Sequence, residues 1–150
     1  MTKLNKSNFS ERLKDLLFDK QINAEQLAAA IGVHKTTSFR WLADTYQPPL
    51  SNALAIADYF GCSLEYLSGK TDIDYTILPK ENYVDFYIRL KEVMNEKNIS
   101  TYAIIKNNSR YSNRSFNCWR KGADPSLSTL IELSNILDVT IDYLVGRDIK

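Results

Sequence analysis

The chain of 150 residues is poor in the residues that build many enzyme sites and secreted scaffolds. Its two cysteines, Cys62 and Cys118, lack CxxC spacing and form neither a zinc motif nor a disulfide framework. A hydrolytic triad or a catalytic zinc site normally uses histidine, and His34 is the single histidine, with no nucleophile motif nearby. These scarcities remove the commonest histidine-dependent enzymes without excluding all enzymes. Our prediction for the whole chain is no enzyme activity, no metal, no cofactor and no small-molecule ligand.

Glycine and proline are also scarce, at five and four residues, in a chain that is 44% hydrophobic and 25% charged. This composition is typical of an ordinary globular protein. No apolar run approaches the roughly 18 residues of a membrane span, and the first ten residues lack an apolar signal core. We therefore expect a cytoplasmic protein without a membrane partner. The formal net charge of only +1 argues, as an average, against nucleic acid.

The chain repeats itself when it is shifted by 77 positions. The aligned pairs include Pro48 with Pro125, Leu50 with Leu127, Tyr66 with Tyr143, and Gly69 with Gly146. The sequence thus predicts two copies of one module, at about 9–70 and 83–147, within domains at 1–70 and 81–150. The segment 71–80 between them holds two acids, β-branched residues and a proline, which predicts an extended linker.

Each module predicts five short helices and therefore an all-α fold. Apolar residues recur at helical spacing at the start of each module. Asn23 and Ser100 are suited to cap the second helix, which Gly32 ends in the first module. A third helix carries Trp41 or Trp119, a fourth begins after the repeated proline, and a fifth ends at the repeated glycine.

The second and third helices of each module, joined by a short turn, match the pattern of a helix-turn-helix, whose second helix can lie in a DNA major groove. Both modules keep acids away from these two helices. The windows 26–43 and 97–123 contain no acid and hold eight of the 19 basic residues. Because this acid-free pattern recurs at the repeat period, it favours a surface that binds phosphates over a charged face that is merely solvated.

Two stretches carry a family resemblance: GVHKTTSFRW at 32–41 and YSNRSFNCWRKG at 111–122. Together with the endings LEYLSG and IDYLVG, they resemble the Cro/repressor-type helix-turn-helix, the lambda-repressor-like or xenobiotic-response-element family. The resemblance covers nearly the whole chain and implies two tandem five-helix DNA-binding domains. It also implies sequence-specific binding of double-stranded DNA by a transcriptional regulator, usually a dimer on paired half-sites.

In the second module the resemblance implies these DNA-binding residues: Thr101, Ser112, Asn113, Arg114, Asn117, Cys118, Arg120 and Lys121. Ser112 would cap the recognition helix. Thr101, at the start of the preceding helix, would hold phosphates together with Arg120 and Lys121 at the end of the recognition helix. Arg114 and the two asparagines suit base edges, because arginine can contact guanine and asparagine adenine through paired hydrogen bonds. Phe116 and Trp119, three positions apart, are expected in the core.

In the first module the corresponding residues are His34, Lys35, Thr36, Thr37, Phe39 and Arg40, with His34 at the helix start, near phosphate. Two registers are open. Matching Trp41 to Trp119 places Ser38 in the core and turns Lys35, Thr36, Phe39 and Arg40 toward DNA. The gapless repeat instead buries Phe39 and Leu42 and exposes Thr36, Thr37, Arg40 and Trp41. We prefer the tryptophan match, because Gly32 and Val33 then fall in the turn.

Two functional classes follow from these patterns. The first is a DNA-binding transcriptional repressor whose modules act as a covalent pseudo-dimer, or pair with another chain as a homodimer, on unlike half-sites. In the second, an antitoxin or interaction adaptor, one module mediates dimerisation or partner binding; Phe39, Leu42 and Asp44 favour it. Because Asp44 stands near the place of Lys121, we hypothesise that the second module carries more of the DNA affinity.

Overall fold

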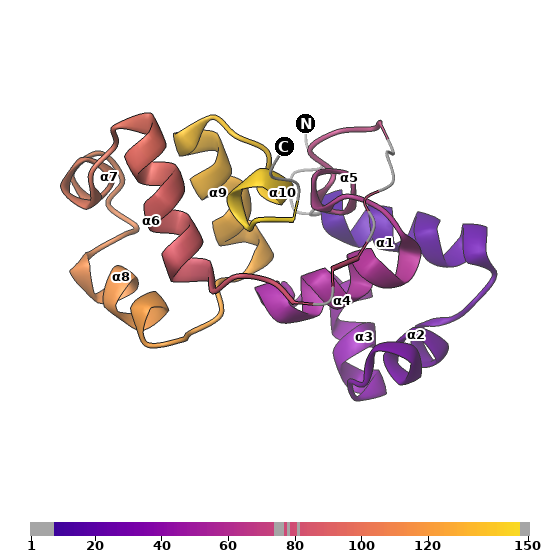
Figure 1. The fold of residues 1–150 in the computed structure, drawn as a ribbon. Helices are drawn as coiled ribbons and strands as arrows, with labels where there is room; N and C mark the ends of the chain where they lie inside the picture. Colours follow the sequence, from indigo (N-terminus) through magenta and orange to yellow (C-terminus); the bar gives the residue numbers. More distant parts are fainter. Residues whose placement is uncertain (1–7, 74–76, 78, 81, 148–150) are drawn as a thin grey trace, which may run out of the picture. The chain divides into compact units, whose positions relative to one another are not determined.

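The structure is a computed structural model that describes residues 8–73, 77, 79–80 and 82–147. The chain divides into two compact units, residues 1–78 (unit 1) and 79–150 (unit 2). All regular structure of the described residues is helical, with α1–α5 in unit 1 and α6–α10 in unit 2 (Figure 1). The all-α prediction is therefore confirmed. The division falls inside segment 71–80; the linker role of that segment and the kind of domain on either side of it stay predictions.

Unit 1 contains α1 (Asn8–Lys20), α2 (Ala24–Ile31), α3 (Lys35–Leu42), α4 (Leu50–Phe60) and α5 (Leu64–Ser68). Helix α1 buries Phe9, Leu13, Leu16 and Leu17, the spacing of one apolar helix face. The other helices close the core over this face with side chains that are fully buried, among them Leu27, Trp41, Ile56, Leu64 and Leu67. Each helix of unit 1 therefore contributes to a single core.

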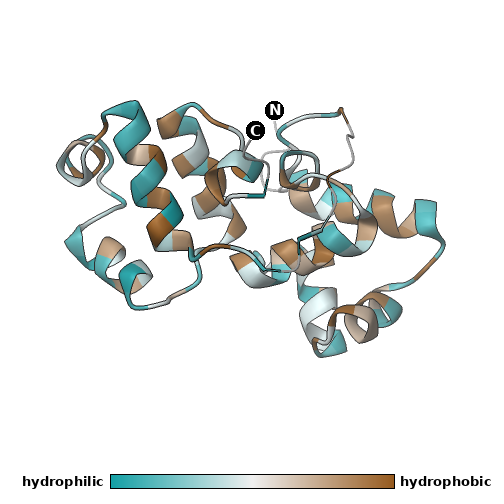
Figure 2. Cartoon of the chain, viewed as in Figure 1, coloured by the Kyte–Doolittle hydropathy of each residue, from teal (hydrophilic) through white to brown (hydrophobic). Residues whose placement is uncertain are grey.

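Unit 2 contains α6 (Phe86–Lys97), α7 (Thr101–Asn107), α8 (Asn113–Arg120), α9 (Leu127–Leu137) and α10 (Ile141–Leu144). Figure 2 shows apolar and polar residues alternating along α6, as expected for a helix with one buried side. The Trp119 ring lies 5.7 Å from Phe86, 6.0 Å from Tyr111 and 5.0 Å from Phe116 between ring centroids. These separations are typical of edge-to-face aromatic packing. The predicted core role of Phe116 and Trp119 is confirmed.

The caps anticipated from the sequence are present in both units. Asn23 Oδ1 accepts the Gln26 N–H at 2.8 Å, and Gln26 Oε1 accepts the Asn23 N–H at 2.9 Å, which makes a complete capping box at the start of α2. Ser100 Oγ accepts the Ala103 N–H at 3.0 Å at the start of α7. The first turns of the helices that precede α3 and α8 are thus held by their own side chains.

An arginine stacked on a tyrosine ties the first helix to the fifth in each unit. The Arg12 guanidinium lies 3.8 Å from the Tyr66 ring centroid, and that of Arg89 lies 4.5 Å from Tyr143. Arg89 also donates two hydrogen bonds to the Tyr143 carbonyl, at 3.1 and 2.9 Å. Because these pairs stand 77 positions apart, the sequence repeat extends to this contact.

A second repeated contact is the ion pair at the end of each fifth helix. In unit 1, Lys70 lies 3.4 Å from Glu65, and both side chains retain some exposure. In unit 2, Arg147 lies 3.0 Å from Asp142, and both side chains are fully buried. A buried charge costs far more than an exposed one when its partner is removed, so the unit 2 pair is the sensitive one.

Replacing Asp142 with alanine is expected to lower the free energy of unfolding of unit 2 by about 3–5 kcal/mol, because the Arg147 charge stays buried with less compensation. The measurement is urea unfolding followed by fluorescence in a Trp41→Phe background, where Trp119 reports unit 2 alone. Glu25→Ala removes an exposed pair with Lys35 and serves as control in a Trp119→Phe background, with an expected change of about 0–1 kcal/mol. Equal effects of the two substitutions would contradict the prediction.

Candidate nucleic-acid interface

The turn between α2 and α3 is built around a glycine and a histidine. Gly32 has a φ of +80° and its N–H bonds to the Ala28 carbonyl at 2.9 Å, which ends α2 in the left-handed conformation that favours glycine. His34 is the N-cap of α3, and its Nδ1 accepts the Thr36 N–H at 3.1 Å. In a neutral ring the proton is then on Nε2, a donor at an exposed helix start. This arrangement is compatible with the predicted phosphate contact.

The tryptophan match is the register that the structure adopts in α3. Trp41 and Ser38 are each 0% exposed, whereas Phe39 is 52% exposed. The gapless register, which buries Phe39 and exposes Trp41, is therefore wrong. The reason is that α7 and the turn after it together have one residue more than α2 and its turn, so the third helices match at a shift of 78 and not 77.

The predicted residues of unit 1 fall on α3 and its cap. His34, Lys35, Thr36, Phe39 and Arg40 are exposed, and Thr37 is half-buried. Lys35 Nζ lies 3.3 Å from the Glu25 carboxylate at the start of α2, and both side chains are exposed. Part of the positive charge that Lys35 brings to this face is therefore offset within the unit.

Unit 2 replaces the glycine of this turn with contacts to α9. Tyr111 is buried against Trp119, and its hydroxyl donates to Glu132 Oε1 at 2.6 Å. Arg110 forms an ion pair with the same carboxylate. Asn108, with an extended backbone, donates from Nδ2 to the Ile104 carbonyl at 3.0 Å. Side chains thus fix the approach to α8, where unit 1 relies on the conformation of Gly32.

Glu132 is a residue of this region that sequence patterns missed. It lies on α9, outside the acid-free window, and unit 1 has Ala55 at the matching position of the repeat. The missing glycine before α8 was the available signal that another contact must hold this turn. One consequence is that Arg110, counted among the basic residues of the window, is engaged by an acid.

The predicted residues of unit 2 lie along one exposed side of α8. Ser112 is its N-cap residue, and the exposed side chains that follow are Asn113, Arg114, Asn117, Cys118, Arg120 and Lys121. Arg120 donates from Nη2 to Asn117 Oδ1 at 3.1 Å, so these two side chains are brought together. Among the described residues, Arg114 and Lys121 form no ion pair. Their charges are therefore available to an external anion.

Thr101 gains a basic neighbour that the sequence did not reveal. Lys91, on α6, donates from Nζ to Thr101 Oγ1 at 3.1 Å. Thr101 is the first residue of α7 and is half-buried. Because Lys91 stands ten positions away and beside Glu92, neither spacing nor charge pattern could assign it to this surface.

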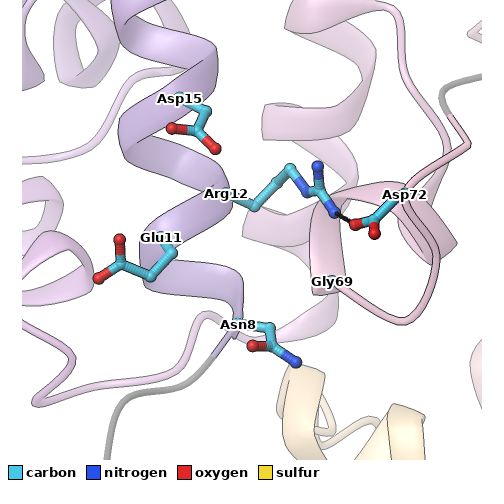
Figure 3. A pocket seen from close by; sticks show the side chains of 6 residues that line it. All are labelled: Asn8, Glu11, Arg12, Asp15, Gly69 and Asp72. Atoms are coloured by element: carbon cyan, nitrogen blue, oxygen red, sulfur yellow. Dashed lines mark hydrogen bonds and ion pairs between the residues drawn. The ribbon is translucent and has the colours of Figure 1, made fainter. Parts of the chain in front are cut away.

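The pocket drawn in Figure 3 lies outside the α2–α3 pair. It has a volume of about 380 Å³ and is lined by Asn8, Glu11, Arg12, Asp15, Gly69 and Asp72. Arg12 points toward Asp72 and bonds to it at 2.9 Å, while Glu11 and Asp15 project from the same helix (Figure 3). Three carboxylates and a single cation line this hollow, so it is unsuited to a phosphate backbone.

Two kinds of feature are absent from the described part of the chain. No cluster of three or more histidine, cysteine, aspartate or glutamate side chains there has an arrangement suited to a metal ion. Each of its helices is also too short or too polar to span a bilayer.

Comparison with known proteins supports the helix-turn-helix assignment of unit 1. Residues 16–67 match the helix-turn-helix family. This segment runs from the end of α1 into α5 and includes α2 and α3, which confirms the predicted helix-turn-helix of unit 1. The family match does not extend to unit 2, whose helix-turn-helix stays a prediction.

Two curated relatives match about half of the chain. An uncharacterized HTH-type transcriptional regulator, YobD of Bacillus subtilis, is 28% identical over 78 residues, which are 52% of this chain and 70% of the relative. The cryptic phage CTXphi transcriptional repressor RstR of Vibrio cholerae is 28% identical over 79 residues, which are 51% of this chain and 71% of the relative. No solved structure matches the chain.

The burial of Tyr111 makes its contribution to the stability of unit 2 depend on pH. Burial raises the pKa of Tyr111 above its ordinary value of 10.0, although the nearby Arg110 charge opposes this. The unfolded state therefore ionises first, so the stability that this phenol contributes is full below pH 10 and falls as the pH rises beyond it. Ultraviolet titration of the wild type minus Tyr111→Phe should give a midpoint above 10, and a midpoint at or below 10 would contradict the placement.

Proposed function

We propose that the protein is a sequence-specific DNA-binding transcriptional regulator that acts as a repressor. The observation that carries the proposal is the helix-turn-helix match over α2 and α3, whose third helix presents an exposed, acid-free side. The exposed Arg40 and Thr36 on that side have the chemistry to contact phosphates and base edges. The repressor role draws support from the relative RstR, which is a transcriptional repressor.

Unit 2 is proposed to be a second helix-turn-helix that reads its own half-site. Its support is the arrangement of α7 and α8, the caps at matching positions and the exposed row that contains Asn113, Arg114 and Asn117. Because α3 and α8 expose different side chains, the two half-sites are unlike and the operator is asymmetric. The two units then act as a covalent pseudo-dimer, or a second chain joins them on a longer site.

The larger share of DNA affinity is assigned to unit 2. Arg114 and Lys121 form no ion pair among the described residues, whereas Lys35 of unit 1 is paired with Glu25. Each phosphate contact releases counterions, so unengaged cations contribute more to binding than paired ones. If either unit instead served as an adaptor or antitoxin, its binding would not depend on contacts between these cations and DNA phosphates.

The first test is selection of duplexes from a random pool by the full chain, followed by mobility shift. We expect an asymmetric site whose affinity falls when salt rises from about 50 to 200 mM, because binding to phosphates releases counterions. Failure to select any duplex, or an affinity that salt leaves unchanged, would contradict DNA binding and favour the adaptor alternative.

The second test compares two cations of unit 2 on the selected duplex. Arg114→Ala should weaken it by about 1–3 kcal/mol and relax one base position, because a base-edge contact is lost. Lys121→Ala is the matched control and should weaken selected and random duplexes alike, lowering the salt slope by about 1. If Arg114→Ala leaves the base preference unchanged, α8 does not read bases through this residue.

A further inference from the structure

The middle of α3 carries an exposed aromatic ring that the core of unit 1 does not use. Phe39 is 52% exposed, while Ser38 and Trp41 occupy the buried side of the same helix. Phe39 is flanked by the exposed side chains of Thr36 and Arg40. The ring therefore lies on the side of α3 that is proposed to enter the major groove.

The matching position in unit 2 shows what kind of contact is made from this place. At the shift of 78 that aligns the two third helices, Phe39 takes the place of Asn117. Asparagine can bond to adenine through its amide, whereas phenylalanine has no donor or acceptor. The apolar group that base pairs present in the major groove is the 5-methyl group of thymine.

The surroundings of Phe39 favour DNA over a protein partner. Within α3 it is the only large apolar side chain that is exposed, and no acid lies on this helix. Protein-binding surfaces are normally contiguous apolar patches, which a single ring between a threonine and an arginine does not form. A cation one residue away suits the approach of a phosphate backbone.

We propose that Phe39 is a specificity-determining residue of unit 1, and that its ring contacts the 5-methyl group of a thymine in the half-site read by α3. This inference rests on the proposed DNA-binding function. It assigns unit 1 a recognition chemistry that depends on apolar contact, in contrast to the hydrogen-bonding side chains of α8.

The test removes single methyl groups from the selected duplex by replacing each thymine in turn with deoxyuridine, which keeps base pairing intact. The wild type should lose about fourfold in affinity at one thymine, the effect of burying one methyl-sized group. Phe39→Ala should abolish this sensitivity, and Phe39→Leu should retain it in part. Asn117→Ala is the control from unit 2 and should keep the wild-type sensitivity. Circular dichroism would verify that each variant keeps its helices.

The outcomes separate this inference from the function on which it rests. If no duplex is selected, the proposed function fails and the inference fails with it. If duplexes bind but no thymine is sensitive, or the sensitivity persists in Phe39→Ala, only the role of Phe39 is wrong. A change in oligomeric state for Phe39→Ala, measured by light scattering with the deoxyuridine profile unaltered, would show that the ring covers a protein surface and would also overturn the proposal.

Discussion

In each unit, burial of one tryptophan beneath the third helix decides which side chains of that helix face outward. Trp41 is 0% exposed in α3, and Trp119 is buried in α8. Since an α-helix turns by 3.6 residues, fixing this ring against the core also fixes the opposite side of the helix. The exposure of Phe39 and Asn117 follows from that single constraint. Any reading of these helices as recognition elements therefore depends on the packing of tryptophan.

The surroundings of the buried tryptophan differ between the two units. In unit 2 the Trp119 ring packs against three other aromatic rings. In unit 1 the residue one turn before Trp41 is Ser38, and the buried Ser38 Oγ and Trp41 Nε1 have no hydrogen-bond partner among the described residues. Buried polar atoms left without partners are costly, by about 1–3 kcal/mol each. In α3 the cost of these two polar atoms therefore offsets part of what the burial of Trp41 contributes.

Local signals in the sequence predicted much of this fold. Asn23, Ser100 and Gly32 bond to backbone groups only a few residues away, so the caps and helix ends could be predicted from sequence spacing alone. The register of α3 was harder, because the repeat at 77 suggested a match of Phe39 with Phe116, whereas the burial of Trp41 follows the shift of 78. The contact of Tyr111 with Glu132 joins a turn to α9, and that of Lys91 with Thr101 joins α6 to α7; no pattern of sequence spacing encodes such pairs.

The low net charge of the chain acquires a different meaning once these contacts are known. An average of +1 conceals the two acid-free windows, 26–43 and 97–123, yet the number of basic residues in a window does not equal the charge it offers. Arg110 is bound by Glu132 and Lys35 by Glu25, so both add little to a field that would attract phosphates. Arg114 and Lys121 keep theirs. A surface with few unengaged cations gains little from non-specific attraction, and discrimination then depends on the side chains that Trp41 and Trp119 orient outward.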